Sequence, residues 1–403
     1  PEIRIKAPIQ ETLIDEEDAI EVEVPDIVRI MDIQQEQLAR SLGTGHRVIH
    51  GVAGSGKTLI LGYRCEFLAQ QTEKPILVLC FNLALAARLR DLISEKGIEA
   101  KVQVRNFHEW CGQQLDTYHV KKPKFSTTYT EELVQCMTKA CADGQIPRAQ
   151  YGAIMIDEGH DFEPEWLQLV TDAIDPDSDS LLLLYDDAQA IYSKKKELGF
   201  SLKSVGVQAQ GRTTILRLNY RNTNQIIEFS HRFAKQFFLN DSSANSDTPL
   251  IQPEASGRQG PDPVVRTLES KQQEAEYICR SMISLHERGT PWSDMCVLYR
   301  VKAQGELLNE VLAKHGVPTH WLSTTAAKRK LKSVDNRVRL MTMHSSKGLE
   351  YPFVAVTGAH QLPLRRCDEV SEAKLLYVAM TRATDKLLVT GCGERGFMER
   401  LVG

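Results

Sequence analysis

The sequence contains no apolar run close to the roughly 20 residues needed to cross a bilayer, and its first residues show no charged-then-apolar signal pattern. Its 9 cysteines form no C-x-x-C pair and no Cys/His array. This scatter argues against a zinc or iron-sulfur site and against a disulfide framework. We therefore expect a cytoplasmic protein with no membrane partner, whose cysteines are mainly buried thiols.

The sequence also lacks a surplus of basic charge, since its formal net charge is -4. The charge is unevenly distributed, however: residues 1–24 carry eight acidic and two basic side chains, which leaves 47 basic and 45 acidic residues elsewhere. We interpret residues 1–27 as an acidic tether that follows an upstream part of a longer chain. Any basic surface that binds a nucleic acid must then be local. The candidates are three basic runs, at residues 121–124, 194–196 and 328–332. The alternative is that these runs are solvated loops.

At 403 residues, with 42% hydrophobic and 25% charged residues, the chain is typical of a globular protein with two or three domains. Short apolar runs alternate with helix-length segments, a rhythm that predicts parallel sheets with helices on both faces. We expect two tandem α/β domains, at residues 28–209 and 210–403. Ligands are then expected beyond the carboxyl ends of the strands and in the cleft between the domains. Strands are predicted at 48–49, 76–80, 102–104, 153–156, 181–184, 215–218, 264–268, 296–299, 340–343, 354–357 and 387–390.

The stretch HGVAGSGKTLIL fits the phosphate-binding pattern G-x-x-x-x-G-K-[ST] between a predicted strand and a predicted helix. Glycines allow backbone N–H groups to converge on an anion at a helix N-terminus. Lys57 is expected to reach the β and γ phosphates, and Thr58 to hold Mg²⁺. The alternative is a glycine-rich turn with a solvated lysine. The predicted nucleotide-binding residues here are Gly51, Gly54, Ser55, Gly56, Lys57 and Thr58.

Acidic and amide side chains follow two further predicted strands. Asp157 and Glu158 end the run YGAIMIDEGHDF, where the first suits a Mg²⁺ ligand and the second suits activation of an attacking water. Gln189, after the run LLLLYDD, is placed to contact the γ phosphate or the water. The alternative for the carboxylates is an ordinary acidic turn. In the second half, Arg221 and Arg382 are candidates for arginine fingers that point at the γ phosphate across a cleft, or for surface ion pairs.

The order of these motifs resembles that of superfamily 1 helicases of the UvrD/Rep/PcrA type, over residues 31 to about 390. The resemblance implies two tandem RecA-like domains and the use of ATP. It also implies that the chain moves on single-stranded DNA. The matching stretches are MDIQQEQLA, GVAGSGKT, CFNLALAARL, NFHEW, DEGHDF, DDAQAIY, NYRNT, MTMHSSKGLEY and EAKLLYVAMTRA.

The resemblance also implies roles for individual residues. Gln35 would recognise adenine and Tyr220 would stack on it. Glu350 would hold the ribose, while Arg221 and Arg382 would contact the γ phosphate. The residues expected along the DNA strand are Phe81, His108, Tyr192, Thr342 and His344.

The chain departs from the family pattern at three points. Lys194 stands where a base-stacking tryptophan is usual, which suggests a phosphate contact instead. His160 stands where a glutamine is usual. The large insertions of both domains are replaced by short polar segments, which favours translocation over processive strand separation. A weaker similarity links the chain to helicase modules that follow nuclease-related (NERD) domains.

Three functions fit these observations. The first is an ATP-dependent translocase or helicase on single-stranded DNA, moving 3′ to 5′ as the resemblance implies. The second is a nucleic-acid-stimulated ATPase switch that drives or loads a partner nuclease without unwinding. The third is a motor directed to RNA.

Overall fold

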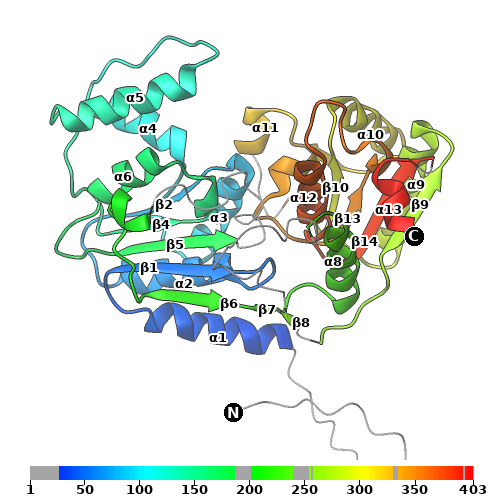
Figure 1. Cartoon of the computed structure of the whole chain (residues 1–403), viewed down its shortest axis with the longest axis horizontal. Coiled ribbons are helices and arrows are strands. Elements are labelled where there is room, and N and C mark those ends of the chain that lie inside the picture. The colour runs from blue at the N-terminus through cyan, green and yellow to red at the C-terminus, as the bar shows by residue number, and fades with distance from the viewer. Residues whose placement is uncertain are drawn as a thin grey trace, which may run out of the picture.

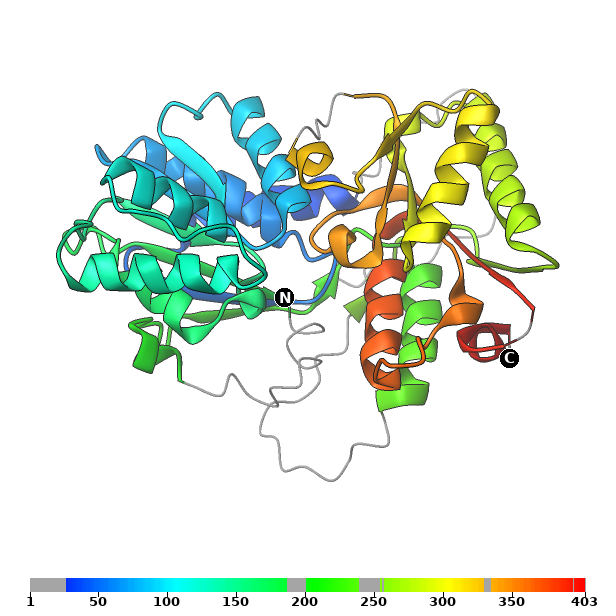
Figure 2. The same cartoon turned by 90° about the horizontal axis from the view of Figure 1, so that it is seen from above.

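The computed structural model describes residues 27–186, 201–238, 254–255, 257–329, 335–393 and 395–402. They form two lobes, each built on a six-stranded sheet with helices on both faces (Figures 1 and 2). All pairings within both sheets are parallel, so the predicted fold class of two tandem RecA-like domains without large inserts is confirmed. Within the described ranges, no helix has both the length and the apolar character required to cross a membrane.

The first sheet has the strand order β3-β2-β4-β5-β1-β6. Helices α1 to α3 cover one face, and α4 to α6 cover the other. The strands are β1 (His46–Gly51), β2 (Ile76–Cys80), β3 (Val102–Asn106), β4 (Ala153–Ile156), β5 (Leu181–Asp186) and β6 (Thr213–Leu216). The helices are α1 (Ile27–Ser41), α2 (Lys57–Ala69), α3 (Leu83–Glu95), α4 (Phe107–Thr117), α5 (Tyr129–Ala142) and α6 (Pro164–Asp172), with the 3-10 turns η1 (Gly159–Asp161) and η2 (Leu202–Val205).

The second sheet has the order β11-β12-β10-β13-β14-β9. Helices α8, α12 and α13 pack on one face, and α9 and α10 on the other. The strands are β9 (Val264–Leu268), β10 (Met295–Tyr299), β11 (Thr319–Trp321), β12 (Val338–Thr342), β13 (Tyr351–Val356) and β14 (Ala383–Cys392), besides the small pair β7 (Leu218–Asn219) and β8 (Glu254–Ala255). The helices are α8 (Asn224–Phe238), α9 (Lys271–Glu287), α10 (Lys302–Lys314), α11 (Thr325–Arg329), α12 (Glu369–Met380) and α13 (Phe397–Val402), with the turns η4 (Trp292–Asp294), η5 (Met343–Ser346) and η6 (Ala359–Gln361).

Strand β5 shows why the central strands are continuous apolar runs. Leu181 and Leu183 belong to the core under α4 to α6, whereas Leu182 and Leu184 belong to the core under α1 to α3. Since successive side chains of a strand point to opposite faces, a strand covered on both sides needs an apolar residue at every position.

One strand assignment from the sequence is wrong. The predicted strand 215–218 was placed in the second domain, but β6 pairs with β1 and completes the first sheet. The change from one sheet to the other therefore lies beyond residue 209. Strand β11 was not predicted. Both errors have one cause, because pairing with a distant strand leaves no trace in the local pattern of β6 or of the three-residue β11.

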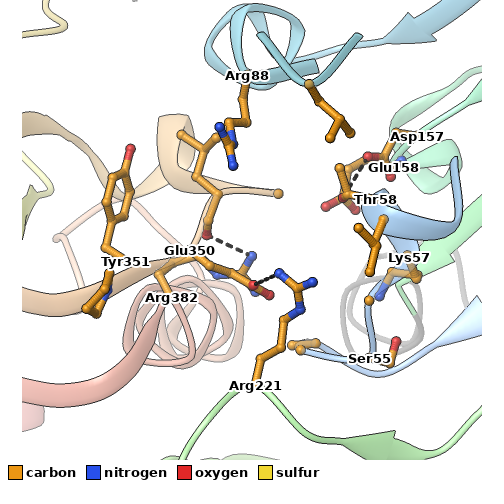
Figure 3. Close-up of a pocket in the computed structure, with 18 of the residues that line it drawn as sticks. Ser55, Lys57, Thr58, Arg88, Asp157, Glu158, Arg221, Glu350, Tyr351 and Arg382 are labelled. Carbon is orange, nitrogen blue, oxygen red and sulfur yellow. Dashed lines mark hydrogen bonds and ion pairs between the residues drawn. The ribbon is translucent and has the colours of Figure 1, made fainter. Parts of the chain in front are cut away.

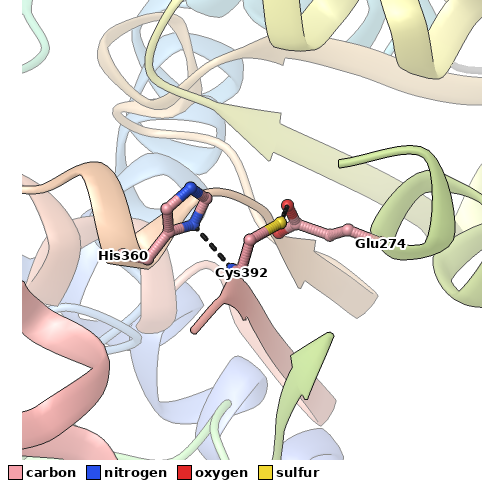
Figure 4. A group of neighbouring side chains, drawn as sticks. All are labelled: Glu274, His360 and Cys392. Carbon is pink, nitrogen blue, oxygen red and sulfur yellow. Dashed lines mark hydrogen bonds between the residues drawn. The ribbon is translucent and has the colours of Figure 1, made fainter. Parts of the chain in front are cut away.

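Glu274 of α9 is a buried hydrogen-bond hub of the second lobe, 3% exposed. Its Oε1 accepts from Thr357 Oγ1 at 2.8 Å, from the Gly358 N–H at 2.8 Å and from Thr390 Oγ1 at 2.7 Å. The Cys392 thiol lies 3.3 Å from Oε2 (Figure 4). These bonds anchor α9 to β14 and to the end of β13.

His360 joins this hub, and its nitrogen, the Cys392 sulfur and a Glu274 oxygen lie within 4.8 Å of one another. The spacing would suit a metal ion, but the hydrogen bonds explain it without one. Nδ1 of His360 accepts the backbone N–H of Cys392 at 2.8 Å, so the proton of the neutral ring sits on Nε2. Burial and the nearby Glu274 raise the pKa of the Cys392 thiol to about 12, which keeps it a donor.

We expect Glu274→Ala to lower the free energy of unfolding by about 2–5 kcal/mol, because it leaves buried donors without their acceptor. Urea unfolding followed by circular dichroism measures this change. The control is Glu276→Ala in the same helix, which removes surface contacts to His315 and Gln272 and should have little effect. Equal, small losses in both variants would contradict the hub.

Candidate functional site

The loop between β1 and α2 is shaped for the close approach of an anion. Gly54 and Gly56 have φ angles of 68° and 81°, in the left-handed region that favours glycine. Gly56 is also the N-cap of α2. The N–H groups of the first helical turn have no acceptor within the helix, and the helix dipole adds positive potential there. The predicted P-loop geometry is thus present.

Side chains complete this loop. Nζ of Lys57 donates to the carbonyl oxygens of Gly51 at 2.7 Å and Val52 at 2.9 Å. A Cβ at Gly51 would lie 2.6 Å from Ser55 Oγ, so a side chain there would displace that hydroxyl. Ser55 Oγ is buried and has no hydrogen-bond partner among the described residues. Because such orphan hydroxyls are costly, a phosphate oxygen is a fitting acceptor for it.

Thr58 and Asp157 meet at the bottom of the site. Thr58 Oγ1 donates to Asp157 Oδ2 at 3.1 Å, and Asp157 is only 2% exposed. Burial and the neighbouring Glu158 raise the pKa of Asp157, while Lys57 lowers it. A hydroxyl beside a carboxylate is a donor set that Mg²⁺ prefers, so these two residues fit the predicted metal site.

Glu158 has a backbone conformation that is unusual for a residue with a side chain. Its φ and ψ are 54° and 48°, a left-handed geometry that costs energy outside glycine and is typical of functional sites. Its N–H donates to Asp157 Oδ1 at 2.9 Å. Nε2 of His160 lies 3.5 Å from Glu158 Oε2, so the histidine that replaces the family's glutamine lies directly beside the expected base.

The second lobe contributes arginines to the site, and a glutamate that faces one of them. Arg382 directly precedes β14, and its Nε donates to Val378 O at 3.0 Å. Glu350 directly precedes β13, and its Oε2 lies 3.4 Å from Nη1 of Arg221. Burial alone would lower the pKa of Arg221, but Glu350 and other neighbours raise it, so the guanidinium is charged.

Both lobes line one cavity of about 480 Å³ (Figure 3). The first lobe supplies the loop at residues 53–59, Asp157 and Glu158, all beyond the carboxyl ends of strands, as expected. The second lobe supplies Glu350 and Arg382 from the amino ends of its strands, which was not expected. The sequence also missed Arg88, Arg339 and Tyr351, which line the same cavity.

Gln35 and Tyr220, expected at the adenine, are not among the residues that line this cavity. Nε2 of Gln35 donates to Ser55 O at 3.1 Å, so it contacts the P-loop itself. Tyr220 is fully buried, and its hydroxyl donates to Asp32 Oδ1 at 2.7 Å. A Cβ at Gly56 would lie 2.2 Å from that hydroxyl. In this conformation the Tyr220 ring has no face open to a base.

An aromatic cluster lies beyond β2 and β3 in the first lobe. Phe81 is 42% exposed, and its ring centroid lies 5.9 Å from that of Trp166 and 5.8 Å from that of His108. Phe107 stacks behind Trp166 at 4.5 Å. Burial lowers the pKa of His108, so its ring is neutral at pH 7. An exposed ring backed by others is the kind of surface on which bases stack.

This cluster adjoins a direct contact between the lobes. Nδ2 of Asn82, next to Phe81, donates to Ser345 O at 3.0 Å and to Lys347 O at 3.2 Å. Nζ of Lys347 lies 3.1 Å from Oδ1 of Asp161 in the first lobe. We call these contacts the interlobe seam.

Thr342 and His344 lie on the second-lobe side of the seam. Thr342 caps η5, and its hydroxyl accepts from the Ser345 N–H at 3.2 Å. His344 is exposed. The structure therefore brings Phe81, His108, Thr342 and His344 to one border between the lobes, and their role on DNA stays a prediction.

Gln189, Tyr192 and Lys194 lie outside the described residues, so their assigned roles stay predictions. Two further residues were not foreseen, Trp166 beside Phe81 and Asp32 beside Tyr220. The sequence did carry a signal for Asp32, because it precedes Gln35 by three positions in α1 and so shares its helix face. Trp166 had no comparable signal.

A P-loop lobe whose cavity is completed by arginines of a second parallel-sheet lobe defines a tandem RecA-like P-loop protein. An AAA domain family matches residues 34–195, and the UvrD-like helicase C-terminal domain family matches residues 214–326 and 322–394. The chain belongs to the UvrD/Rep type of superfamily 1 helicases.

Individual relatives match shorter stretches. The ATP-dependent DNA helicase Rep of Salmonella typhimurium is 41% identical over 66 residues, 15% of this chain and 10% of the relative. The ATP-dependent DNA helicase UvrD2 of Mycobacterium tuberculosis is 29% identical over 175 residues, 42% of this chain and 23% of the relative. This chain thus covers less than a quarter of either relative. A solved structure described as the C-terminal domain of a possible DNA helicase from Lactobacillus covers 46% of this chain and 94% of its own, at 20% identity and a TM-score of 0.33.

We expect Phe81→Ala to weaken binding of single-stranded DNA by about 1–3 kcal/mol, the usual contribution of one base stacked on an aromatic ring. Fluorescence anisotropy with a labelled oligonucleotide measures it. Ile215→Ala is the control, since Ile215 is an apolar residue of similar exposure (49%, against 42% for Phe81) in β6, an edge strand of the first sheet. Unchanged affinity in Phe81→Ala would remove this residue from the DNA track.

Proposed function

We propose that the chain is an ATP-driven motor that moves along single-stranded DNA with 3′-to-5′ polarity. The observation that supports this best is the cavity that both lobes line. A triphosphate bound to one wall would meet Arg221 and Arg382 on the other, so its hydrolysis would change the attraction between the lobes. The polarity rests on the family resemblance.

The first lobe would bind the nucleotide. Backbone N–H groups of the P-loop and Nζ of Lys57 would contact the β and γ phosphates. Lys57 would exchange its present carbonyl acceptors for phosphate oxygens, which are stronger partners for an ammonium group. Thr58 and Asp157 would hold Mg²⁺, which supplies charge neutralisation at the phosphates.

Hydrolysis would require residues from both lobes. Glu158 would take the proton of an attacking water, a role supported by its position in the cavity lining beside Asp157. Arg221 and Arg382 would stabilise the charge that builds on the terminal phosphate, a contribution of about 10³ to 10⁵ in rate in comparable enzymes. Neither lobe alone contains the complete set.

The interlobe seam supports coupling of this chemistry to DNA. Asn82 lies between Phe81 and α3, and it contacts the segment that runs from Thr342 to Glu350. One end of that segment borders the proposed DNA track, and the other lines the cavity. Closure of the cavity would therefore shift the residues that hold the strand.

Glu158→Gln should reduce ATP turnover by about 10² to 10⁴-fold, the usual contribution of a general base, while ATP binding changes little. Lys57→Ala should reduce both binding and turnover. Steady-state phosphate release and binding of a fluorescent ATP analogue separate the two effects. The control is Glu165→Gln, an exposed glutamate in the next helix. Normal turnover in Glu158→Gln or Lys57→Ala would contradict the site.

The second candidate is a DNA-stimulated switch that drives a partner nuclease without unwinding. The short connections favour it: in the described part of the first lobe, for example, only residues 118–128 separate α4 from α5. No subdomain that would separate strands is evident there.

Unwinding of tailed duplexes decides between these candidates. As a motor with helicase activity, the chain should release the strand from a 3′-tailed duplex and not from a 5′-tailed one, and single-stranded DNA should stimulate hydrolysis. Hydrolysis rates with single-stranded DNA, duplex DNA, RNA or no polymer are measured in parallel. Stimulated hydrolysis without strand release would support the switch. Equal or stronger stimulation by RNA would support a motor on RNA.

A further inference from the structure

Arg221 is held between carboxylates from the two lobes. Its Nη1 lies 3.4 Å from Glu350 Oε2, and its Nη2 lies 3.3 Å from Asp32 Oδ1 in α1. Arg221 and Glu350 line the cavity, whereas Asp32 does not. The contact with Asp32 therefore ties one guanidinium nitrogen of a cavity-lining arginine to a carboxylate of α1 that lies outside the cavity.

A second bond fixes the position of Asp32. The same oxygen, Oδ1, accepts from the Tyr220 hydroxyl at 2.7 Å. Tyr220 is fully buried, and its hydroxyl lies close to Gly56 of the P-loop. One carboxylate oxygen thus holds two consecutive residues, so Asp32 is constrained and not a loosely placed surface acid.

A carboxylate and a phosphate would compete for the same donors of Arg221. The guanidinium presents its N–H groups in a rigid planar fork that matches either anion. A terminal phosphate that takes both Nη atoms of Arg221 competes with Asp32 for Nη2 and with Glu350 for Nη1, and of these two carboxylates only Asp32 lies outside the cavity. A diphosphate has no group at that position and makes no such demand.

We infer that Asp32 is a positioning residue that competes with the terminal phosphate of ATP for Arg221. This inference rests on the proposed function, because it assumes that Arg221 serves the γ phosphate. Asp32 weakens the binding of triphosphate selectively, and it recaptures Arg221 when the terminal phosphate leaves. It thereby favours reopening of the cavity after each hydrolysis.

The test is Asp32→Asn, which removes the charge but keeps an oxygen that accepts from Tyr220. The side chains of Arg221 and Asp32 are 29% and 33% exposed, so the pair resembles a surface ion pair. We expect affinity for a non-hydrolysable ATP analogue to rise about 1.5- to 5-fold, the range that exposed pairs give, while ADP affinity stays the same. Titration with fluorescent forms of both nucleotides measures the ratio.

Two comparisons make the result specific. Glu36→Gln removes the same charge one turn further along α1, where Glu36 pairs with Arg40 at 2.9 Å, and it should not change the ratio. In an Arg221→Ala background, Asp32→Asn should have no effect on the ratio, because the competing partner is absent.

Several outcomes would overturn the inference: an equal gain for ADP, a gain that persists without Arg221, an unchanged ratio, or a loss of affinity for the ATP analogue. A merely structural role would reduce the fraction of binding-competent protein without changing the ratio. Failure of the motor proposal is distinguishable, because it would appear as absent ATP turnover in the unaltered chain, whereas the binding ratio is measured without turnover.

Discussion

Residues 219–223 form the crossing where the chain passes from the first lobe to the second. Their hydrogen bonds connect the phosphate-binding loop to the second lobe, and the geometry of the cavity depends on them. The Tyr220 N–H donates to Gly54 O of the P-loop at 3.2 Å. Two residues later, Asn222 is fully buried and donates through Nδ2 to Thr381 O at 2.9 Å. One short loop is therefore bonded to the phosphate-binding loop on one side and to the neighbour of Arg382 on the other. Displacement of the P-loop must reach the second lobe through it, because buried polar groups keep their partners.

The charges of the cavity are arranged around this crossing. The first lobe places Asp157 and Glu158 against Lys57, and the second places Glu350 against Arg221. Groups fixed in this way need little reorganisation when a polyanion enters, which is the physical basis of electrostatic preorganisation. Both arginines already have partners, so the binding energy is the difference between these contacts and the contacts that the polyanion adds or replaces.

Local features of the sequence predicted a large part of this arrangement. The run at 181–184 is apolar at every position because both faces of β5 are covered, and Gly54 and Gly56 are glycines because their φ angles require it. These two requirements, an apolar residue at each strand position and glycine at a positive φ, involve only neighbouring residues, so a local pattern reveals them. By contrast, β6 was assigned to the wrong sheet, and Asp32 and Trp166 were missed. The sheet of β6 and the position of Trp166 depend on partners in distant parts of the chain, which local patterns do not record, whereas the helix face that Asp32 shares with Gln35 was a local signal that did not identify its partners.

The segment from Thr342 to Tyr351 connects the proposed DNA track at one end with the cavity at the other. Thr342 pairs beside Tyr299 at one end of β10, while Phe353 pairs beside Met295 at the other, so the connection must run back along the sheet and cross β10. Residues 343–346 form the 3-10 turn η5, and a second turn follows, in which the Leu349 N–H donates to Ser346 O at 3.0 Å and Gly348 has a φ of 74°. Asn82 bonds the middle of this connection to the first lobe, so Glu350 at the cavity lies only a few residues from the interlobe seam.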